Sequence, residues 1–270
     1  MPYHPNERVL PMSRILWYGV LATTAALALF VALRVVAAFD PERLWHIVHD
    51  ECVPNEARHA DPTPCALVHL HDGAERGYAV YKDDYGATQF LLIPTARITG
   101  IESPALLHAE APNYFAAAWR TRNYVDNALG RPLPRDALSF AVNSPLRRSQ
   151  NQLHIHMDCI EPRVRAALAR HADAIGEAWS VFPEPLAGHA YRARRVLGED
   201  LDQANPFLLL AAGVAGARDD MGAHTLIVAG AQFANGVPGF VLLDAQARLA
   251  SGETFQGEEL QDHFCAAARD

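Results

Sequence analysis

One short stretch, residues 150–158 (QNQLHIHMD), carries the densest group of side chains that can do chemistry. Side chains alternate along a strand, so the apolar residues share one face and point into the core: Leu153, Ile155 and Met157. The polar residues share the opposite face: Gln152, His154, His156 and Asp158. Two imidazoles on one face can act as a nucleophile and its partner, or as two metal ligands. A half-exposed strand that turns polar residues outward gives the same pattern, so the pattern alone leaves these interpretations open.

Side chains that could hold a phosphate surround this stretch. Arg147, Arg148 and Ser149 lie in the preceding polar loop, where a guanidinium can bind phosphate oxygens in a bidentate manner. Lys82 is the only lysine beside 22 arginines, which hints that an ammonium group is required there. Further candidates follow along the chain: Asn143, His189, Arg194 and Arg195. The histidine can act as an acid or base or serve in the core, and each cation can equally be a solvated surface charge.

The sequence predicts the elements that must position these residues. Six segments have the composition of strands: 78–82, 89–93, 138–142, 152–159, 226–229 and 240–243. Helices are predicted over three others: 41–50, 112–130 and 162–179. Clustered strands with intervening helices, rather than strict alternation, indicate an α+β fold on an antiparallel sheet.

Composition excludes several classes of protein. The chain has 270 residues, half of them apolar, which is enough to bury a core and excludes disorder. Its formal net charge of -8 argues against nucleic-acid binding, which needs a basic face.

The apolar residues concentrate near the N-terminus, from Ile15 to Leu33, in nineteen residues without a charge. As a helix this segment would be roughly 28 Å long, close to the thickness of a bilayer core of ~30 Å. The apolar region of a cleaved signal peptide is shorter, so we favour an uncleaved anchor over 15–36. Arg8 and Arg14 precede the segment and Arg34 and Arg43 follow it, so the charge asymmetry is slight. The short, free N-terminal tail favours an N-terminus inside the cell and an exported remainder.

Four cysteines follow the apolar segment, and an even number in an exported domain predicts two disulfides. Cys52 and Cys65 bracket a short loop that would gain from being pinned, so we pair these two and leave Cys159 with Cys265. A zinc site is disfavoured because no pair has the spacing CxxC. Four reduced core thiols would fit only an inverted topology.

A series of motifs carries a resemblance to a known family. The strand at 150–156 (Q-N-x-x-H-I-H) resembles the signature of the histidine-triad superfamily. Within that superfamily the chain resembles the bacterial CDP-diacylglycerol pyrophosphatases. The matching motifs run through nearly the whole chain in order: E-C-V-P-N at 51–55, P-x-P-C at 62–65, L-L-I-P-T at 91–95, G-x-E-S-P at 100–104, N-S at 143–144, G-H-x-Y-x-A-R-R at 188–195 and Q-D-H-x-C at 261–265.

The resemblance implies hydrolysis of CDP-diacylglycerol to CMP and phosphatidate through a histidine nucleophile, without cofactor or bound metal. The superfamily has three alternating histidines, of which the middle one attacks phosphorus. If His156 is the last of the three histidines, His154 is the nucleophile and Gln152 stands in place of the first histidine. We prefer this register, because it puts Ser149 three residues before the triad, where the family has a hydroxyl residue. The other register begins at His154 and ends at Asp158. The resemblance implies these phosphate-binding residues: Lys82, Asn143, Arg148, Ser149, Gln152, His189, Arg194 and Arg195.

These observations predict four parts: a cytoplasmic tail (1–14), a transmembrane anchor (15–36), a disulfide-closed connecting segment (37–67) and a histidine-triad-like catalytic domain (68–270). The catalytic domain would lie in the periplasm, tethered to the bacterial inner membrane where a phospholipid-nucleotide substrate resides. Two alternatives stay open. One is a nucleotidyl- or phosphotransferase on the same fold, and the other a metal-binding envelope protein that uses the same histidines as ligands. The sequence leaves the oligomeric state undetermined.

Overall fold

The computed structural model describes residues 40–248, 250 and 252–266. The chain divides into two compact units, Met1–Pro41 and Glu42–Asp270, and the second contains all the helices and strands given below. The predicted tail and anchor (1–36) lie outside the described residues. Within the described residues, no helix combines the length and apolar character needed to cross a bilayer.

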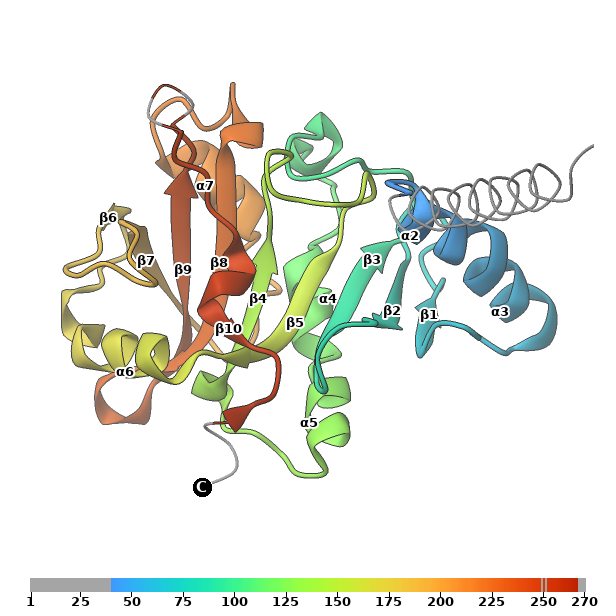
Figure 1. Cartoon of the computed structure of the whole chain (residues 1–270), viewed down its shortest axis with the longest axis horizontal. Coiled ribbons are helices and arrows are strands. Elements are labelled where there is room, and N and C mark those ends of the chain that lie inside the picture. Colours follow the sequence, from blue (N-terminus) through green and yellow to red (C-terminus); the bar gives the residue numbers. More distant parts are fainter. Residues whose placement is uncertain (1–39, 249, 251, 267–270) are drawn as a thin grey trace, which may run out of the picture. The chain divides into compact units, whose positions relative to one another are not determined.

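Ten strands, counted over the described residues, form one antiparallel sheet (Figure 1). Their order is β1-β2-β3-β5-β4-β8-β9-β7-β6, and β10 pairs with β5 beside that path. The first strands are β1 (Leu67–His69), β2 (Tyr78–Lys82), β3 (Phe90–Pro94), β4 (Leu138–Val142) and β5 (Ile155–Ile160). The others are β6 (Ser180–Val181), β7 (Arg192–Leu197), β8 (His224–Gln232), β9 (Pro238–Gln246) and β10 (Gln261–Asp262). The predicted α+β class with an antiparallel sheet is confirmed.

The histidine-bearing strand β5 is a central strand. His156 lies opposite Leu91 of β3 on one side and opposite Ala141 of β4 on the other. Farther along β5, Cys159 lies opposite Asp262 of β10. The C-terminal segment 256–265 therefore returns to β5, and it crosses the front of the sheet over β4 and β5 in Figure 1.

Helices cover the two faces of the sheet. Four of them follow β3 in the chain: α4 (Tyr114–Arg120), α5 (Asn123–Leu129), α6 (Pro162–Arg170) and α7 (Pro206–Gly213). The apolar side chains of β5 join α4 and α7 in the larger core, whereas α6 packs with β8 and β9 in a second core. A third, smaller cluster joins α2 (Arg43–His46) and the following helical turns, Ile47–Cys52 and α3 (Val53–His59), to β1 and β3. The segment before residue 68 thus packs onto the same sheet as the residues after it.

Several element boundaries differ from those predicted. The single helix predicted over 112–130 is two helices that divide at Thr121, where the amide and the hydroxyl both donate to the carbonyl of Ala117. Gly130 ends the second helix with a positive φ of 78°, as predicted. The helix predicted to reach residue 179 ends at Arg170, and the strand predicted from Gln152 begins at Ile155.

Both predicted disulfides are confirmed. Cys52–Cys65 fastens the helical N-terminal segment, and Cys159–Cys265 ties β5 to the C-terminal segment across a sequence separation of 106. The prediction that Cys52 and Cys65 enclose only a loop is wrong, because α3 lies between them. Pro54 occupies the first turn of this helix, where its missing N–H has no cost.

Candidate active site

His154 and His156 lie side by side on the face of β5 opposite the larger core. Their ring centroids are 4.8 Å apart with the planes at 68°, and each residue is only 6% exposed. The apolar residues between and beside them, Leu153, Ile155 and Met157, are buried in the larger core as the alternation predicts. The amide of Leu153 donates to the carbonyl of Ile98 and fixes the chain just before the strand.

The tautomer of His154 follows from one hydrogen bond. Its Nδ1 lies 2.7 Å from the carbonyl oxygen of Gln152, which can only accept, so Nδ1 carries the proton. The neutral ring then presents a lone pair at Nε2. Burial lowers the pKa of His154, and the charge of Arg148 adds to this against the opposing effect of the Gln152 carbonyl. The ring is therefore neutral near pH 7.

His156 is held by two groups at Nδ1: the side-chain amide of Gln89 at 2.8 Å and a carboxylate oxygen of Glu258 at 3.2 Å. Burial lowers the pKa of His156 to about 4, against the opposing charge of Glu258. Its Nε2 is buried and has no partner within the described part of the chain. A bound anionic group would satisfy this nitrogen, if the amide of Gln89 donates to Nδ1 and Nε2 carries the proton.

Glu258 reaches the histidines from the C-terminal segment. Its carboxylate accepts hydrogen bonds from Asn143 at 2.6 Å and from Gln256 at 2.9 Å. Burial opposes its charge, but the nearby imidazoles and these two hydrogen bonds prevail and hold the pKa of Glu258 near 2. The site therefore contains a fixed carboxylate beside two neutral imidazoles.

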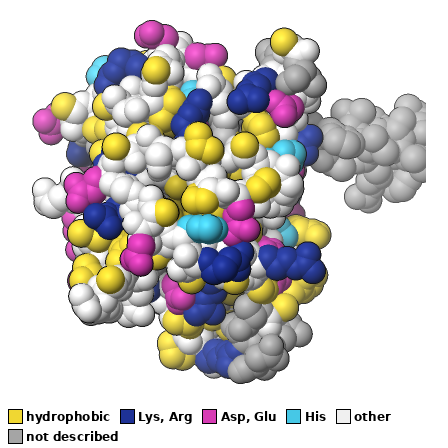
Figure 2. All heavy atoms as spheres, turned by 90° about the vertical axis from the view of Figure 1, so that its left-hand side faces the viewer, with side chains coloured by type: hydrophobic (Ala, Val, Ile, Leu, Met, Phe, Trp, Pro, Cys, Tyr) yellow, Lys and Arg dark blue, Asp and Glu magenta, His cyan; other side chains and the backbone are white. Residues whose placement is uncertain are grey.

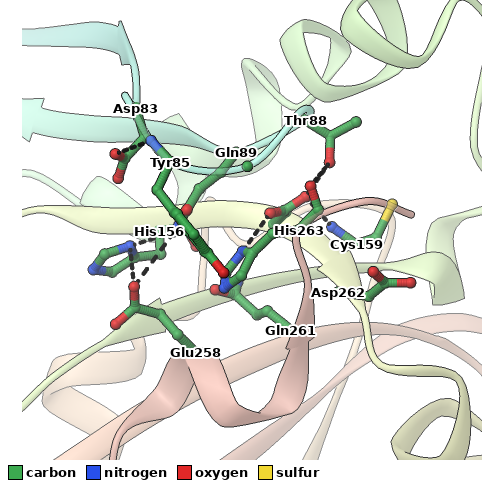
Figure 3. A network of polar contacts seen from close by, with 12 residues as sticks. Asp83, Tyr85, Thr88, Gln89, His156, Cys159, Glu258, Gln261, Asp262 and His263 are labelled. Atoms are coloured by element: carbon green, nitrogen blue, oxygen red, sulfur yellow. Dashed lines mark hydrogen bonds and ion pairs between the residues drawn. The ribbon is translucent and has the colours of Figure 1, made fainter. Parts of the chain in front are cut away.

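A second pair lies at the other end of the same strand face. Asp158, fully buried, accepts a hydrogen bond from Thr88 at 2.7 Å and faces Nδ1 of His263 at 2.8 Å. Figure 3 shows Thr88 and His263 at this end and His156 with Glu258 at the other. Gln261 donates to the backbone carbonyl of His156 at 3.1 Å and so joins the C-terminal segment to the strand. Polar groups from three parts of the sequence thus meet on one face of β5.

Some of the predicted phosphate-binding residues lie beside the histidines. Arg148 pairs with Glu102 at 2.6 Å and is close enough to His154 to lower its pKa. Ser149 is exposed in the adjoining loop. Asn143 is buried and bound to Glu258, so it positions that carboxylate.

The side chain of Gln152 does not face a ligand site. It is fully buried and donates to the backbone carbonyls of Pro94 and Ala96, at 2.9 and 2.8 Å. It thereby fastens the histidine segment to the end of β3. What Gln152 supplies to His154 is its backbone carbonyl.

The other predicted residues are not brought to the histidines. Lys82 donates to the backbone carbonyls of Asp83 and Gly86 and closes the β2–β3 loop. His189 lies against Glu259, with 3.4 Å between Nε2 and the carboxylate. The arginine pair is on β7, four strands from β5 and hence about 19 Å away. Acidic, basic and apolar side chains are mixed across the face that carries β6, β7 and α6 (Figure 2).

Sequence reasoning missed Gln89, Glu258 and His263 as site residues. The motif Q-D-H-x-C at 261–265 contains His263 and carried part of the family resemblance, so it was a usable signal. No local pattern marks Gln89 or Glu258, because only the sheet register and the return of the C-terminal segment bring them to His156.

One group of potential metal ligands occurs within the described residues: Asp158, Cys159 and Cys265. The two sulfurs are joined in the disulfide and offer no thiolate.

The geometry defines an α+β protein whose polar site stands on a histidine-bearing central strand and is completed by a covalently tied C-terminal segment. A family model described as CDP-diacylglycerol pyrophosphatase matches residues 39–269. The chain is also 39% identical over 257 residues to CDP-diacylglycerol pyrophosphatase of Yersinia pestis, covering 94% of this chain and 96% of that relative. The chain belongs to the CDP-diacylglycerol pyrophosphatase family, a family of hydrolases. The predicted family and enzyme class are confirmed.

Proposed function

We propose that this protein hydrolyses the pyrophosphate bond of CDP-diacylglycerol to CMP and phosphatidate through a covalent intermediate on His154. Family membership supports the substrate and the reaction. The hydrogen bond from Nδ1 of His154 to the carbonyl of Gln152 carries the mechanism, because it directs the lone pair of a neutral ring through Nε2.

The other residues act on the charge of the diphosphate. Nε2 of His156, buried without a partner among the described residues, donates to a phosphate oxygen as negative charge develops. The guanidinium of Arg148 adds a cation beside His154, and Ser149 offers a hydroxyl from the adjoining loop. Gln89 orients the ring of His156 by donating to its Nδ1, and the carboxylate of Glu258 lies beside the same ring.

The cellular setting is part of the proposal. An anchor at 15–36 would hold the enzyme on the inner membrane, at the surface where a diacylglycerol substrate lies. Two disulfides are typical of an oxidising compartment, which supports a catalytic domain in the periplasm. The products place the reaction in phospholipid metabolism.

The test uses the full chain in detergent micelles with CDP-diacylglycerol. We expect CMP and phosphatidate in equal amounts. Quenching during turnover with denaturant at alkaline pH, where a phosphorus–nitrogen bond survives, followed by peptide mapping should find an adduct on His154. An adduct on His156 would show that His156, and not His154, is the nucleophile. The absence of any histidine adduct would exclude the covalent mechanism.

Two further outcomes separate the alternatives. A transferase would form a new phosphodiester when glycerol is added, at the expense of one hydrolysis product. A metal-binding envelope protein would release no CMP and would retain metal through purification. Its presumed third ligand, His189, contacts Glu259 and Phe255 instead of the two strand histidines.

A further inference from the structure

A cavity of about 830 Å³ lies outside the histidine site. Cavities of roughly 300 to 1,000 Å³ are typical of small-molecule binding sites, and these are lined mainly by apolar side chains. Most of the residues around this cavity are apolar or aromatic, among them Trp45, Val53, Pro54, Ile98, Ala105 and Pro112. The cavity is therefore suited to an apolar ligand.

One wall of the cavity is joined to the segment that carries the proposed nucleophile. The carbonyl of Ile98 accepts from the amide of Leu153 at 2.6 Å, and the carbonyl of Ala96 accepts from the side chain of Gln152 at 2.8 Å. The carbonyl of Gln152 in turn lies 2.7 Å from Nδ1 of His154. Short hydrogen-bonded links therefore connect this wall to the nucleophile.

A second wall belongs to the helical segment on the same face of the sheet as the strand histidines. Leu91 of β3 lies opposite His156, so the two side chains point to one face. Leu44 of α2 belongs to the same apolar cluster as Leu91, and its amide donates to the side chain of Gln150 at 3.0 Å. The next residue, Trp45, lines the cavity. The segment that leads into the histidines thus contacts both walls.

The ring of Trp45 is held by two neighbours. The ring of His49 stacks on it, with 4.4 Å between centroids and 22° between planes. The guanidinium of Arg97 lies 5.0 Å from the centroid of the Trp45 ring and also pairs with Glu42. A wall that is ordered before a ligand arrives loses little conformational entropy on binding.

The proposed substrate carries acyl chains close to the reacting phosphorus, because only glycerol and one phosphoester separate the diphosphate from the two ester-linked chains. We propose that this cavity binds an acyl chain of the lipid substrate and selects diacylglycerol over smaller alcohols. This inference rests on the proposed function. In a bilayer the chain leaves one apolar medium for another, so the exchange is nearly balanced. The cavity then acts by placing the diphosphate at His154.

The test measures kcat/KM of the full chain in detergent micelles for the dibutanoyl, dihexanoyl and dioctanoyl forms of CDP-diacylglycerol. Each methylene buried in the cavity should raise kcat/KM by up to about fourfold, since it contributes ~0.8 kcal/mol. Longer chains also partition more strongly into micelles, so variants are compared by the ratio of kcat/KM for the dioctanoyl and dibutanoyl substrates. Partition affects every variant equally and cancels in that comparison.

The variants are Ala105→Trp and its control Ala174→Trp. Both alanines are exposed and lie in short 3₁₀ helices, Pro104–Leu107 and Ala172–Ala174, but only Ala105 lines the cavity. An indole that excludes two methylenes should lower the ratio about 15-fold, at ~0.8 kcal/mol each. The control should keep the wild-type ratio. An unchanged ratio in Ala105→Trp would overturn the inference, and so would a fall in Tm alone, which would mean that another part of the chain fills the cavity.

Photochemical labelling gives an independent reading on the wild-type enzyme and does not depend on the folding of a variant. A substrate with a diazirine at the end of one acyl chain should label residues 45–54 or 105–112. Labels confined to the predicted anchor would show that the chain stays in the membrane, which would overturn the inference. In that case CMP would still be released from every substrate. Failure of the proposed function would instead appear as no CMP from any of them.

Discussion

Two histidine–aspartate pairs lie at different places in the same sheet and have opposite surroundings. On β8 and β9, Nδ1 of His224 lies 2.7 Å from Asp244, and both side chains are completely buried. Arg192 of β7 neutralises the same carboxylate at 2.5 Å. On β5, no arginine among the described residues pairs with Asp158, which faces a histidine ring that is partly exposed. The distances are nearly equal, so distance alone does not identify a site.

The two pairs differ in whether solvent or a substrate can reach the histidine ring, and in the surroundings of the ring nitrogen Nε2. His224 keeps its Nε2 buried without a partner in the described part of the chain, where no substrate can reach it. Asp244 of β9 binds His224 of β8 and Arg192 of β7, so the β8–β9 pair joins three adjacent strands and is structural. The β5 pair lies on the strand that carries the proposed nucleophile, His154, and on the same side as the carboxylate of Glu258. Four predictions test this division.

The largest effect is expected from His154→Ala. Removal of a nucleophile should lower kcat by on the order of 10⁴-fold or more, since the covalent route is lost. His224→Ala should leave kcat nearly unchanged and lower the Tm. CMP release and thermal unfolding, measured on both variants, check the contrast. An active His154→Ala would contradict it.

The two disulfides should differ in the same way. In the chain-entropy model a loop of about 100 residues gains about 4.7 kcal/mol and one of about 15 residues about 3 kcal/mol. The double replacement Cys159→Ser and Cys265→Ser should therefore lower the free energy of unfolding more than Cys52→Ser with Cys65→Ser. Only the first should also reduce kcat, since it releases the segment that holds His263 and Glu258. Denaturant unfolding and CMP release measure the two effects, and equal losses of kcat would refute the distinction.

Asp244→Asn should act on stability alone. Breaking a buried charge network costs about 3 kcal/mol, because Arg192 and His224 lose their common partner. The Tm should fall and kcat should stay nearly unchanged, as thermal unfolding and CMP release will measure. A large loss of kcat would mean that the β8–β9 pair takes part in the site.

The smallest effect is expected from Glu258→Gln. The carboxylate of Glu258 accepts hydrogen bonds from Asn143 and Gln256 beside the ring of His156. A hydrogen bond to a charged group contributes about 1.5 kcal/mol, so weakening this arrangement should lower kcat about tenfold. The neighbouring Glu259→Gln is the control, because Glu259 contacts His189 at 3.4 Å and lies outside the histidine cluster. Equal kcat values for the two variants would remove Glu258 from the site.

Much of the fold could be predicted because it depends on local patterns. The alternation at 153–157 places three apolar residues in the larger core, and Gly130 ends its helix because a positive φ suits glycine. Boundaries are less predictable where side chains bond to the backbone. The predicted helix over 112–130 divides at Thr121, whose hydroxyl bonds to the carbonyl of Ala117, and Gln152 bonds to Pro94 and Ala96 just before β5 begins.

The site could be predicted only where one element supplies it. The histidine pair follows from strand periodicity, but Arg194 and Arg195 share a motif with His189 and still lie four strands from β5. Glu258 and His263 are about a hundred residues beyond the strand that they serve. The pairing of β10 with β5 brings them to that strand, and no local pattern in the sequence predicts this long-range contact.

The covalent return of the C-terminal segment has a consequence for synthesis of the protein. Cys265 follows Cys159 by 106 residues, so β5 leaves the ribosome long before the segment that covers it. Until then the two imidazoles stand on an uncovered sheet face without the carboxylate of Glu258 or the ring of His263. The polar cluster therefore assembles late. Its assembly coincides with formation of the Cys159–Cys265 disulfide, which can form only after both cysteines have been synthesised.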